Sequence, residues 1–325
     1  MTFNEQNIQA VMSLGYTDRE SRFLSIVAAH SGHFLRRQFL QFSGAERGYA
    51  PQDFLRKAVA NRHITANTFT QANYCRYHLF ARAVYRALDK EHSSNRKTGS
   101  ETRVLLKLKV LDFVLENSDE EYLEEESDKV RYFTVECGLD KACLPATEYR
   151  SKTGGVSTIR YFVDKFPIFI PQPEVDPGTP LTFTYFESFH EGSESLVTHL
   201  ETYRPLFKAL KTPFRFLYVA NKARYFELAE KRFNAVLSRH NQEFYSPSML
   251  AYFRLRKMWE EKRFAEFTDP DINRLNRGAK YFSRDEHQAR YRQWLTTEVQ
   301  RKEDASGPRP PSQSSAIFET YLLRR

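Results

Sequence analysis

The chain has little cysteine and glycine and no long apolar run. Its three cysteines, Cys75, Cys137 and Cys143, are an odd number without the spacing of a disulfide framework or a zinc site, which indicates free thiols in a cytoplasmic protein. Only 12 residues are glycine while 41% are hydrophobic, so we expect a globular protein. The sequence contains no apolar stretch of about eighteen residues and no signal-peptide pattern at its start. These absences predict a cytoplasmic protein without a membrane partner.

The motifs of common enzymes are missing as well. The run Thr153-Gly154-Gly155 is an ordinary turn rather than a phosphate-binding loop, and no Gly-x-Ser-x-Gly nucleophile motif occurs. Four histidines stand near expected helix ends, where this residue is more often a capping or surface residue than a ligand: His30, His33, His190 and His199. We therefore predict no metal site and no cofactor.

Charge is strongly segregated along the chain. Residues 1–110 carry a net charge of +9, residues 111–200 carry −11 and residues 201–325 carry +10, giving +8 in total. Two basic ends around an acidic middle are typical of a protein whose ends contact a polyanion, although such charges can also simply solvate a surface. We interpret the seven carboxylates between Asp119 and Asp128 as a solvated helix start that also repels DNA, rather than as a metal site.

Residues 17–86 follow the order of a winged helix-turn-helix. Thr17 and Glu20 have the spacing of a capping box, and apolar residues recur at helical spacing behind them. Two further helices are indicated before residue 61. The runs 64–69 and 74–80, separated by a polar turn, then predict a hairpin. Three helices followed by a hairpin favour the winged helix over the alternative, a small helical bundle with a solvated basic helix.

The third helix is predicted to have two different faces. Its apolar side chains, Phe54, Leu55, Ala58 and Val59, fall on one side at 100° per residue, and its long polar side chains fall on the other. A helix that reads the major groove needs such a packed face and donors that reach phosphates and base edges. The predicted DNA contacts are Gln52, Arg56, Lys57 and Arg62, with Arg36, Arg37 and Arg76 as weaker candidates for the phosphate backbone.

The rest of the chain predicts a mixed α/β domain. Residues 92–118 are expected to form a hinge and a connector helix. Residues 119–245 carry strand patterns at 161–163, 166–170, 181–186 and 214–219, and helices begin near 193 and 223. Pro205 should kink or break the first of these helices. Residues 246–303 indicate a basic helical extension, and residues 304–325 a flexible tail. The predicted fold class is α+β or α/β, an N-terminal winged helix (1–91) followed by a restriction-endonuclease-like mixed sheet.

A nuclease of that fold needs an acid at one strand end, and an acid, one residue and a lysine on the next strand. These carboxylates hold magnesium, and the lysine steadies the attacking water. The candidate acids are Asp164, Glu174, Asp176 and Glu187. Because the lysine position falls on Phe189 in the run Glu187-Ser188-Phe189, we expect a catalytically silent domain.

Several runs resemble the replication-relaxation family, winged-helix proteins of bacterial plasmids and integrative elements. In the N-terminal segment they are Tyr16-Thr17-Asp18-Arg19-Glu20, Phe54-Leu55-Arg56-Lys57 and Arg76-Tyr77-His78-Leu79-Phe80. Farther along, Tyr185-Phe186-Glu187 and Leu200-Glu201-Thr202-Tyr203 are similar in order to that family's degenerate nuclease-like core. The resemblance covers residues 17–90 and 160–235, and the long basic helical C-terminus departs from it. It implies DNA binding near replication or mobilisation machinery.

The sequence therefore predicts a non-enzymatic protein that binds double-stranded DNA in the replication, mobilisation or regulation of a bacterial mobile element. A relaxase, replication or defence protein is the expected further partner. One alternative is a magnesium-dependent nuclease that uses Asp164 or Asp176 with Glu187. A second alternative is an adaptor whose winged helix binds a protein and whose segment 317–322 docks elsewhere.

Overall fold

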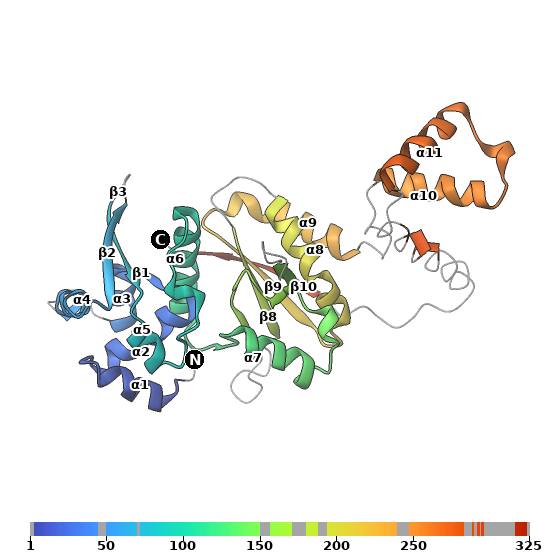
Figure 1. Ribbon diagram of the computed structural model, residues 1–325. Coiled ribbons are helices and arrows are strands. Elements are labelled where there is room, and N and C mark those ends of the chain that lie inside the picture. The colour runs from blue at the N-terminus through green and yellow to red at the C-terminus, as the bar shows by residue number, and fades with distance from the viewer. Residues whose placement is uncertain are drawn as a thin grey trace. The chain divides into compact units, whose positions relative to one another are not determined.

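The computed structural model (Figure 1) has a mixed α and β architecture, in agreement with the predicted class. It describes residues 3–44, 50–69, 72–149, 157–170, 180–187, 194–238, 247–282, 288, 291–292, 294–295 and 316–323. The chain divides into two compact units, one of Met1–Phe233 with Gln313–Arg325 and one of Asn234–Ser312. Within the described ranges, every helix is too short or too polar to cross a bilayer.

The larger unit begins with helices that pack on a small antiparallel sheet of order β1-β3-β2. The elements are α1 (Glu5–Met12), α2 (Asp18–His30), β1 (His33–Leu35), α3 (Arg36–Ser43), α4 (Ala50–Ala60), β2 (Ile64–Phe69) and β3 (Ala72–Leu79). Helix α2 starts at the predicted capping box, because Thr17 and Glu20 each accept a hydrogen bond from the other's backbone N–H. The buried rings of Phe23 and Phe54 lie 6.1 Å apart at the centre of this part.

The polar part of residues 92–118, which was predicted as a hinge, contacts α2. After α5 (Arg82–Ala87), the short helix η1 (Ser94–Arg96) is fixed against α2, since the buried Asn95 amide donates to the carbonyls of Ala28 and Ala29 at 3.1 and 2.8 Å. Gly32 has a φ of +74°, and a side chain there would collide with the carbonyl of Asn95. Helix α6 (Glu101–Glu116) then packs against α2, α3 and β1 on one side and β8 on the other. The polar segment before α6 is therefore held to α2 by hydrogen bonds.

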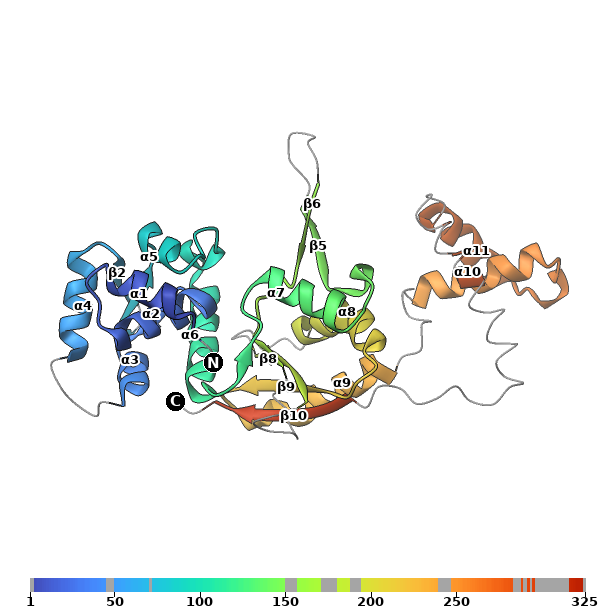
Figure 2. The same ribbon diagram turned by 90° about the horizontal axis from the view of Figure 1, so that it is seen from below.

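A five-stranded sheet of order β10-β9-β8-β7-β4 forms the second half of this unit (Figure 2). Its strands are β4 (Glu121–Tyr122), β7 (Ile168–Ile170), β8 (Leu181–Phe186), β9 (Phe214–Ala220) and β10 (Ala316–Leu322). Strands β8, β9 and β10 are parallel to one another, whereas β7 is antiparallel to β8 and to β4. Every residue of β8 is buried, as expected for a central strand.

Helices cover both faces of this sheet. Successive side chains of β8 point to opposite faces, so Phe186 meets Phe113 of α6 at 5.5 Å, while Phe183 meets Phe207 of α8 (Glu194–Ala209) at 5.0 Å. Helix α9 (Phe226–Ser238) lies on the same face as α8, because Phe216 of β9 contacts both. Of the predicted kink or break at Pro205, a break is excluded, because the residue lies inside the continuous helix α8.

The predicted flexible tail is wrong for residues 316–322. They form β10, the edge strand of the sheet, in parallel register with β9 from Phe214 to Ala220. On one face of the sheet, the ring centre of Phe318 lies 5.2 Å from that of Phe233. On the other, the hydroxyl of Tyr321 donates to Glu116 at 2.7 Å. The apolar residues after the proline-rich stretch therefore complete the sheet.

A second hairpin stands apart from the sheet between β4 and β7. It consists of β5 (Ala146–Tyr149) and β6 (Thr158–Tyr161), and helix α7 (Glu126–Arg131) lies at its base. Figure 2 shows this hairpin projecting away from the sheet. The strand predicted at 161–163 ends earlier, since Phe162 and Lys165 have left-handed φ angles of 49° and 59°. Such a backbone cannot continue a strand.

The smaller unit is helical, as predicted for residues 246–303. Its described helices include α10 (Pro247–Glu260) and α11 (Asp269–Phe282). It has its own apolar core, centred on Tyr252, Phe253, Tyr291 and Trp294. Some of the aromatic residues among its basic residues are thus core residues of this unit, whereas Trp259 and Phe264 are half exposed.

Candidate nucleic-acid interface

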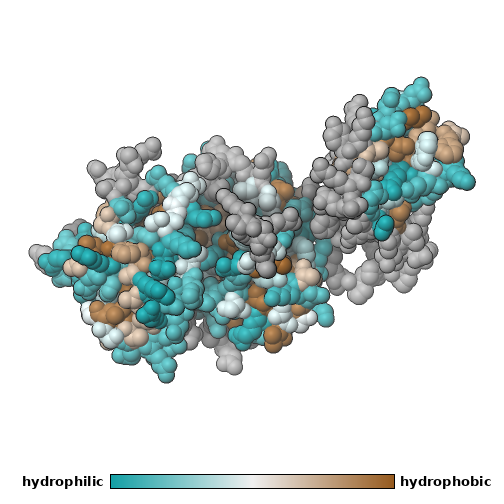
Figure 3. All heavy atoms as spheres, in the orientation of Figure 1, coloured by the Kyte–Doolittle hydropathy of each residue, from teal (hydrophilic) through white to brown (hydrophobic). Residues whose placement is uncertain are grey.

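Helix α4 presents one buried and one exposed face. Phe54 is fully buried, while Gln52 and Arg56 are exposed. Val59 is 43% exposed, so its predicted place in the packed face was wrong. Figure 3 shows hydrophilic residues over most of the visible surface, with only small hydrophobic patches. The exposed face of α4 offers long polar donors beside the partly exposed Val59.

Two arginines of this region extend into solvent. The guanidinium of Arg56, whose side chain is 78% exposed, pairs with Asp53 one turn earlier. An exposed pair of this kind is weak, so a phosphate can replace the carboxylate. Arg62 is exposed at the turn between α4 and β2, where its φ is 54°. Both side chains lie where a duplex lying along α4 would meet them.

Lys57 does not face solvent as predicted. Its ammonium group binds the carboxylate of Glu20, whose side chain is only 10% exposed, and lies 5.0 Å from the ring centre of Tyr16. Because Glu20 also holds the start of α2, Lys57 links α4 to α2. This lysine positions the helix, and its side chain is directed away from the face that carries Arg56.

The weaker candidates are also separated by the structure. Arg37 forms two hydrogen bonds of 2.7 Å with the buried carboxylate of Asp112 in α6, so it joins α3 to α6. Arg36, the neighbouring residue, is exposed at the start of α3. Arg76 is half-buried on β3, opposite Leu35 of β1 and Asn67 of β2.

Of the acids proposed for a nuclease, the structure describes only Asp164 and Glu187, and neither belongs to a described group of three or more metal-ligating side chains. Asp176 and Glu174 lie outside the described residues. Asp164 accepts hydrogen bonds from the hydroxyl of Tyr203 and the backbone N–H of Phe166, both at 3.1 Å, and lies 3.1 Å from Nδ1 of His199. Burial acts to raise the pKa of Asp164, but these hydrogen bonds and the neighbouring positive charges lower it overall. Protein groups thus use the hydrogen-bonding capacity of this carboxylate.

Glu187 belongs to a neighbouring polar cluster at the end of β8. Its side chain accepts a hydrogen bond from the hydroxyl of Tyr218, and Nζ of Lys109 donates to its backbone carbonyl at 3.1 Å. Burial raises the pKa of Glu187. Among the described residues, no group of three or more metal-ligating side chains occurs. The absence of a metal site remains a prediction.

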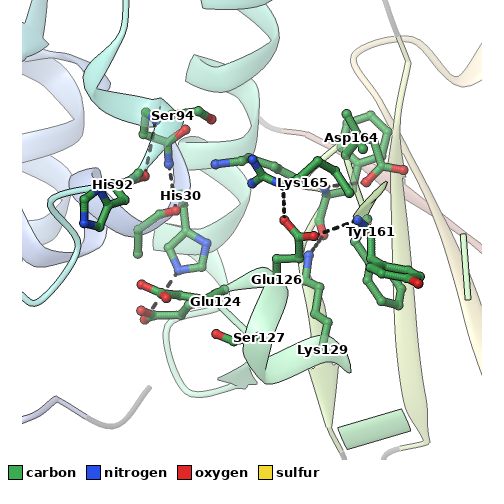
Figure 4. Close-up of a pocket in the computed structure, with 18 of the residues that line it drawn as sticks. His30, His92, Ser94, Glu124, Glu126, Ser127, Lys129, Tyr161, Asp164 and Lys165 are labelled. Atoms are coloured by element: carbon green, nitrogen blue, oxygen red, sulfur yellow. Dashed lines mark hydrogen bonds and ion pairs between the residues drawn. The ribbon is translucent and has the colours of Figure 1, made fainter. Parts of the chain in front are cut away.

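A large pocket lies between α6 and the base of the β5–β6 hairpin (Figure 4). It has a volume of about 1360 Å³. His30, His92 and Ser94 line it from the N-terminal half, while Lys129 and Lys165 line it from the other side. The side chain of His30 is only 5% exposed, so this histidine is buried rather than at the surface as expected.

The pocket has an excess of positive charge that the sequence did not reveal. Nine lysines and arginines line it against five aspartates and glutamates, a net charge of +4. The lining comes from α2, η1, α6, α7, β6 and the loop before β7. Because these segments span residues 29 to 166, only the fold brings them together. Comparisons of the chain with protein-family models, curated proteins and solved structures found no match.

Proposed function

We propose that the protein binds double-stranded DNA without cleaving it, through α4, the turn after it and the β2–β3 hairpin. The observation that carries this proposal is the two-sided setting of α4. Phe54 fixes one side in the aromatic core and Lys57 ties the helix to α2, while Gln52 and Arg56 remain exposed. A major-groove helix needs this rigid support beneath long donors.

The order of elements supports a winged-helix interpretation. The β2–β3 hairpin follows helices α2, α3 and α4 in the chain. Strand β1, which lies between α2 and α3 in the chain, pairs with β3. In this arrangement α4 is the recognition helix and the hairpin is the wing. From the resemblance to the replication-relaxation family, we further propose a role in the replication, mobilisation or regulation of a bacterial mobile element.

Fluorescence anisotropy of a labelled duplex, measured over a range of salt concentrations, tests this interface. Replacing both exposed arginines, Arg56→Ala with Arg62→Ala, should reduce the slope of log affinity against log salt by about two, because each lost phosphate contact reduces it by roughly one. The matched control is Lys222→Ala with Lys231→Ala, which removes two exposed cations near and on α9. Equal duplex affinity in the arginine variant and the wild type would refute the proposal.

A nuclease remains the second candidate because of one observation. The structure places Lys109 of α6 beside Glu187, which supplies a lysine that the sequence pattern of β8 lacks. Incubation of the protein with DNA and Mg²⁺ or Mn²⁺, beside a Glu187→Gln variant, separates the two functions. We expect no cleavage in either sample, and metal-dependent cleavage lost in the variant would favour the enzyme.

A further inference from the structure

Three cations in the pocket have no acidic partner. Arg103 and Lys107 lie one turn apart on α6, and Lys165 lies in the loop before β7. Within the part of the chain that the structure describes, their side chains form neither an ion pair nor a hydrogen bond. Burial, followed by repulsion from Lys165 and Arg103, lowers the pKa of Lys107 to about 8. The three charges therefore oppose one another in the folded protein.

Four of the five carboxylates of the pocket are matched by other groups, and the fifth, Asp89, forms an ion pair with none of the three cations. Glu125 and Glu126 attract Lys165 without pairing with it. Glu126 accepts hydrogen bonds from Arg160 at 2.8 Å and from the backbone N–H of Tyr161 at 2.7 Å. Lys90 pairs with Glu124 at 2.8 Å and with Glu125 at 3.1 Å. Asp164 is held by His199 and Tyr203, as described above. No acid that lines the pocket is thus paired with Arg103, Lys107 or Lys165, and an anion from outside the protein can neutralise them.

Exposed apolar side chains stand beside these cations. Four apolar residues of the pocket wall are exposed to solvent by 41–73%, whereas others, such as Phe162 and Phe166, are buried; the exposed four are Val135, Tyr149, Ile159 and Val163. Across the β5–β6 hairpin Tyr149 pairs with Thr158 and Ile159 pairs with Glu148, so the two apolar side chains belong to successive pairs and to opposite faces of the hairpin. Positive charge beside apolar and aromatic side chains is the combination that holds phosphates and unstacked bases at the same time.

The backbone that carries Lys165 is strained. Two residues of this short loop, Phe162 and Lys165, have left-handed φ angles of 49° and 59°. Non-glycine residues rarely adopt this conformation because it is strained, and such strain concentrates at binding sites. The strain and the unmatched charge therefore occur together in one loop.

We propose that this pocket binds a single strand of nucleic acid, at a site separate from the duplex interface of α4. The bases of a duplex are stacked inside it and cannot reach Tyr149 or Ile159, whereas those of a single strand can. The volume of about 1360 Å³ exceeds the range of about 300–1000 Å³ that is typical of small-molecule pockets. Size and chemistry together favour a strand over a mononucleotide.

The test compares a labelled single-stranded oligonucleotide of about 12 nucleotides with a labelled duplex, using the full-length protein and fluorescence anisotropy. Lys107→Gln with Lys165→Gln should weaken single-strand binding about tenfold and leave duplex binding within about twofold. Lys222→Gln with Lys231→Gln removes the same net charge outside the pocket and should change neither. The Arg56→Ala, Arg62→Ala variant should show the reverse pattern, so failure of the pocket and failure of the α4 interface are distinguishable.

Competition and a second variant complete the test. Unlabelled ATP or pyrophosphate that displaces the strand at equal phosphate concentration would show a small-ligand site and overturn the assignment. Equal single-strand affinity of the Lys107→Gln, Lys165→Gln variant and the wild type would overturn it as well. If that variant does not fold, Glu126→Gln provides the test in the opposite direction. This variant removes a pocket carboxylate and frees Arg160, so single-strand affinity should rise two- to threefold, which is about half the effect of one added phosphate contact. Unchanged single-strand affinity would refute the proposal.

Discussion

Two buried histidines determine how the folded protein responds to acid. Burial is the main cause that lowers the pKa of His30 to about 4 and of His33 to about 3. Lys90 and Lys129 add to the effect at His30, against the opposing charge of Glu124. The unfolded chain takes up protons on these residues near its ordinary pKa of 6.5, whereas the folded chain does not. Stability is therefore fully present above pH 6.5 and is lost as the pH falls toward 4.

We predict that the free energy of unfolding in urea falls by about 2 kcal/mol per buried histidine between pH 7 and pH 5. The variant His33→Gln should lose about half of this pH dependence, because a glutamine cannot take up the proton. His92, whose side chain is 91% exposed, is the control, and His92→Gln should keep the wild-type dependence. A wild-type protein equally stable at both pH values would contradict the prediction.

The adjacent residues Arg36 and Arg37 should have different roles, one in duplex binding and the other in stability, and separate substitutions distinguish these roles. Asp112 is 7% exposed and accepts hydrogen bonds from Arg37 and from Gln38. Arg37→Ala leaves this carboxylate short of partners and should lower the free energy of unfolding by about 2 kcal/mol, a value reduced for the half-exposed arginine. Arg36→Ala should leave stability unchanged and weaken duplex binding. Urea unfolding and anisotropy measure the two effects, and equal stability of both variants would argue against a structural role for Arg37.

At the scale of elements, the edge strand β10 makes the clearest prediction. Phe318 packs against Phe216 and Phe233, whereas Ile317 is 43% exposed. We expect Phe318→Ala to lower the free energy of unfolding by about 2–3 kcal/mol, somewhat less than for a fully buried phenylalanine. Ile317→Ala, on the same strand, should cost less than about 1 kcal/mol. Thermal and urea unfolding of the two variants would show whether β10 is needed for stability.

Elements with a strong local pattern could be predicted from the sequence. The capping box before α2, the strand Leu181–Phe186 and the hairpin after α4 each depend on neighbouring residues, and the structure contains all three. Strand β10 was missed because its pattern is short and follows a proline-rich stretch, and its partner β9 lies about 100 residues earlier in the chain. Pairing at that separation leaves no local signal.

The side chains of the candidate sites were harder to predict. Helical spacing predicted Lys57 on the exposed face beside Arg56, because it could not show that Glu20, 37 residues away, would bind it. Arg37 finds Asp112 at a separation of 75 residues for the same reason. The cationic pocket is assembled from distant segments, so the sequence gives the net charge of each segment but not the place where the positive charges meet. Sequence patterns predict on which face of its helix or strand a side chain lies. Which residue that side chain contacts depends on the tertiary fold.

At the scale of the whole molecule, the charge segregation seen along the chain is partly cancelled in space. Acids of the negative middle segment pair with cations of the basic N-terminal segment, as Asp112 does with Arg37 and Glu124 with Lys90. The excess positive charge is consequently concentrated at particular places, among them the pocket beside α6. Net charge alone would have suggested a uniformly basic end.

The smaller unit is inserted between two neighbouring strands, since Asn234–Ser312 begins within α9, after β9, and ends before β10. It has its own core and is expected to fold independently. Replacing residues 247–312 by a flexible linker should change the free energy of unfolding of the larger unit by less than about 1 kcal/mol, because loop length affects stability only weakly. Circular dichroism and urea unfolding would measure this. Loss of the sheet on deletion would show that the inserted unit is required for folding.

The position of β10 has a consequence during translation. The ribosome makes β9 roughly 100 residues before its edge partner, which corresponds to about 5–20 s at ordinary rates of synthesis. For that interval one side of β9 lacks hydrogen-bond partners and invites pairing with other nascent chains. The helical insert that emerges in between then delays closure of the sheet, so fast synthesis or chaperone cover should favour correctly assembled molecules.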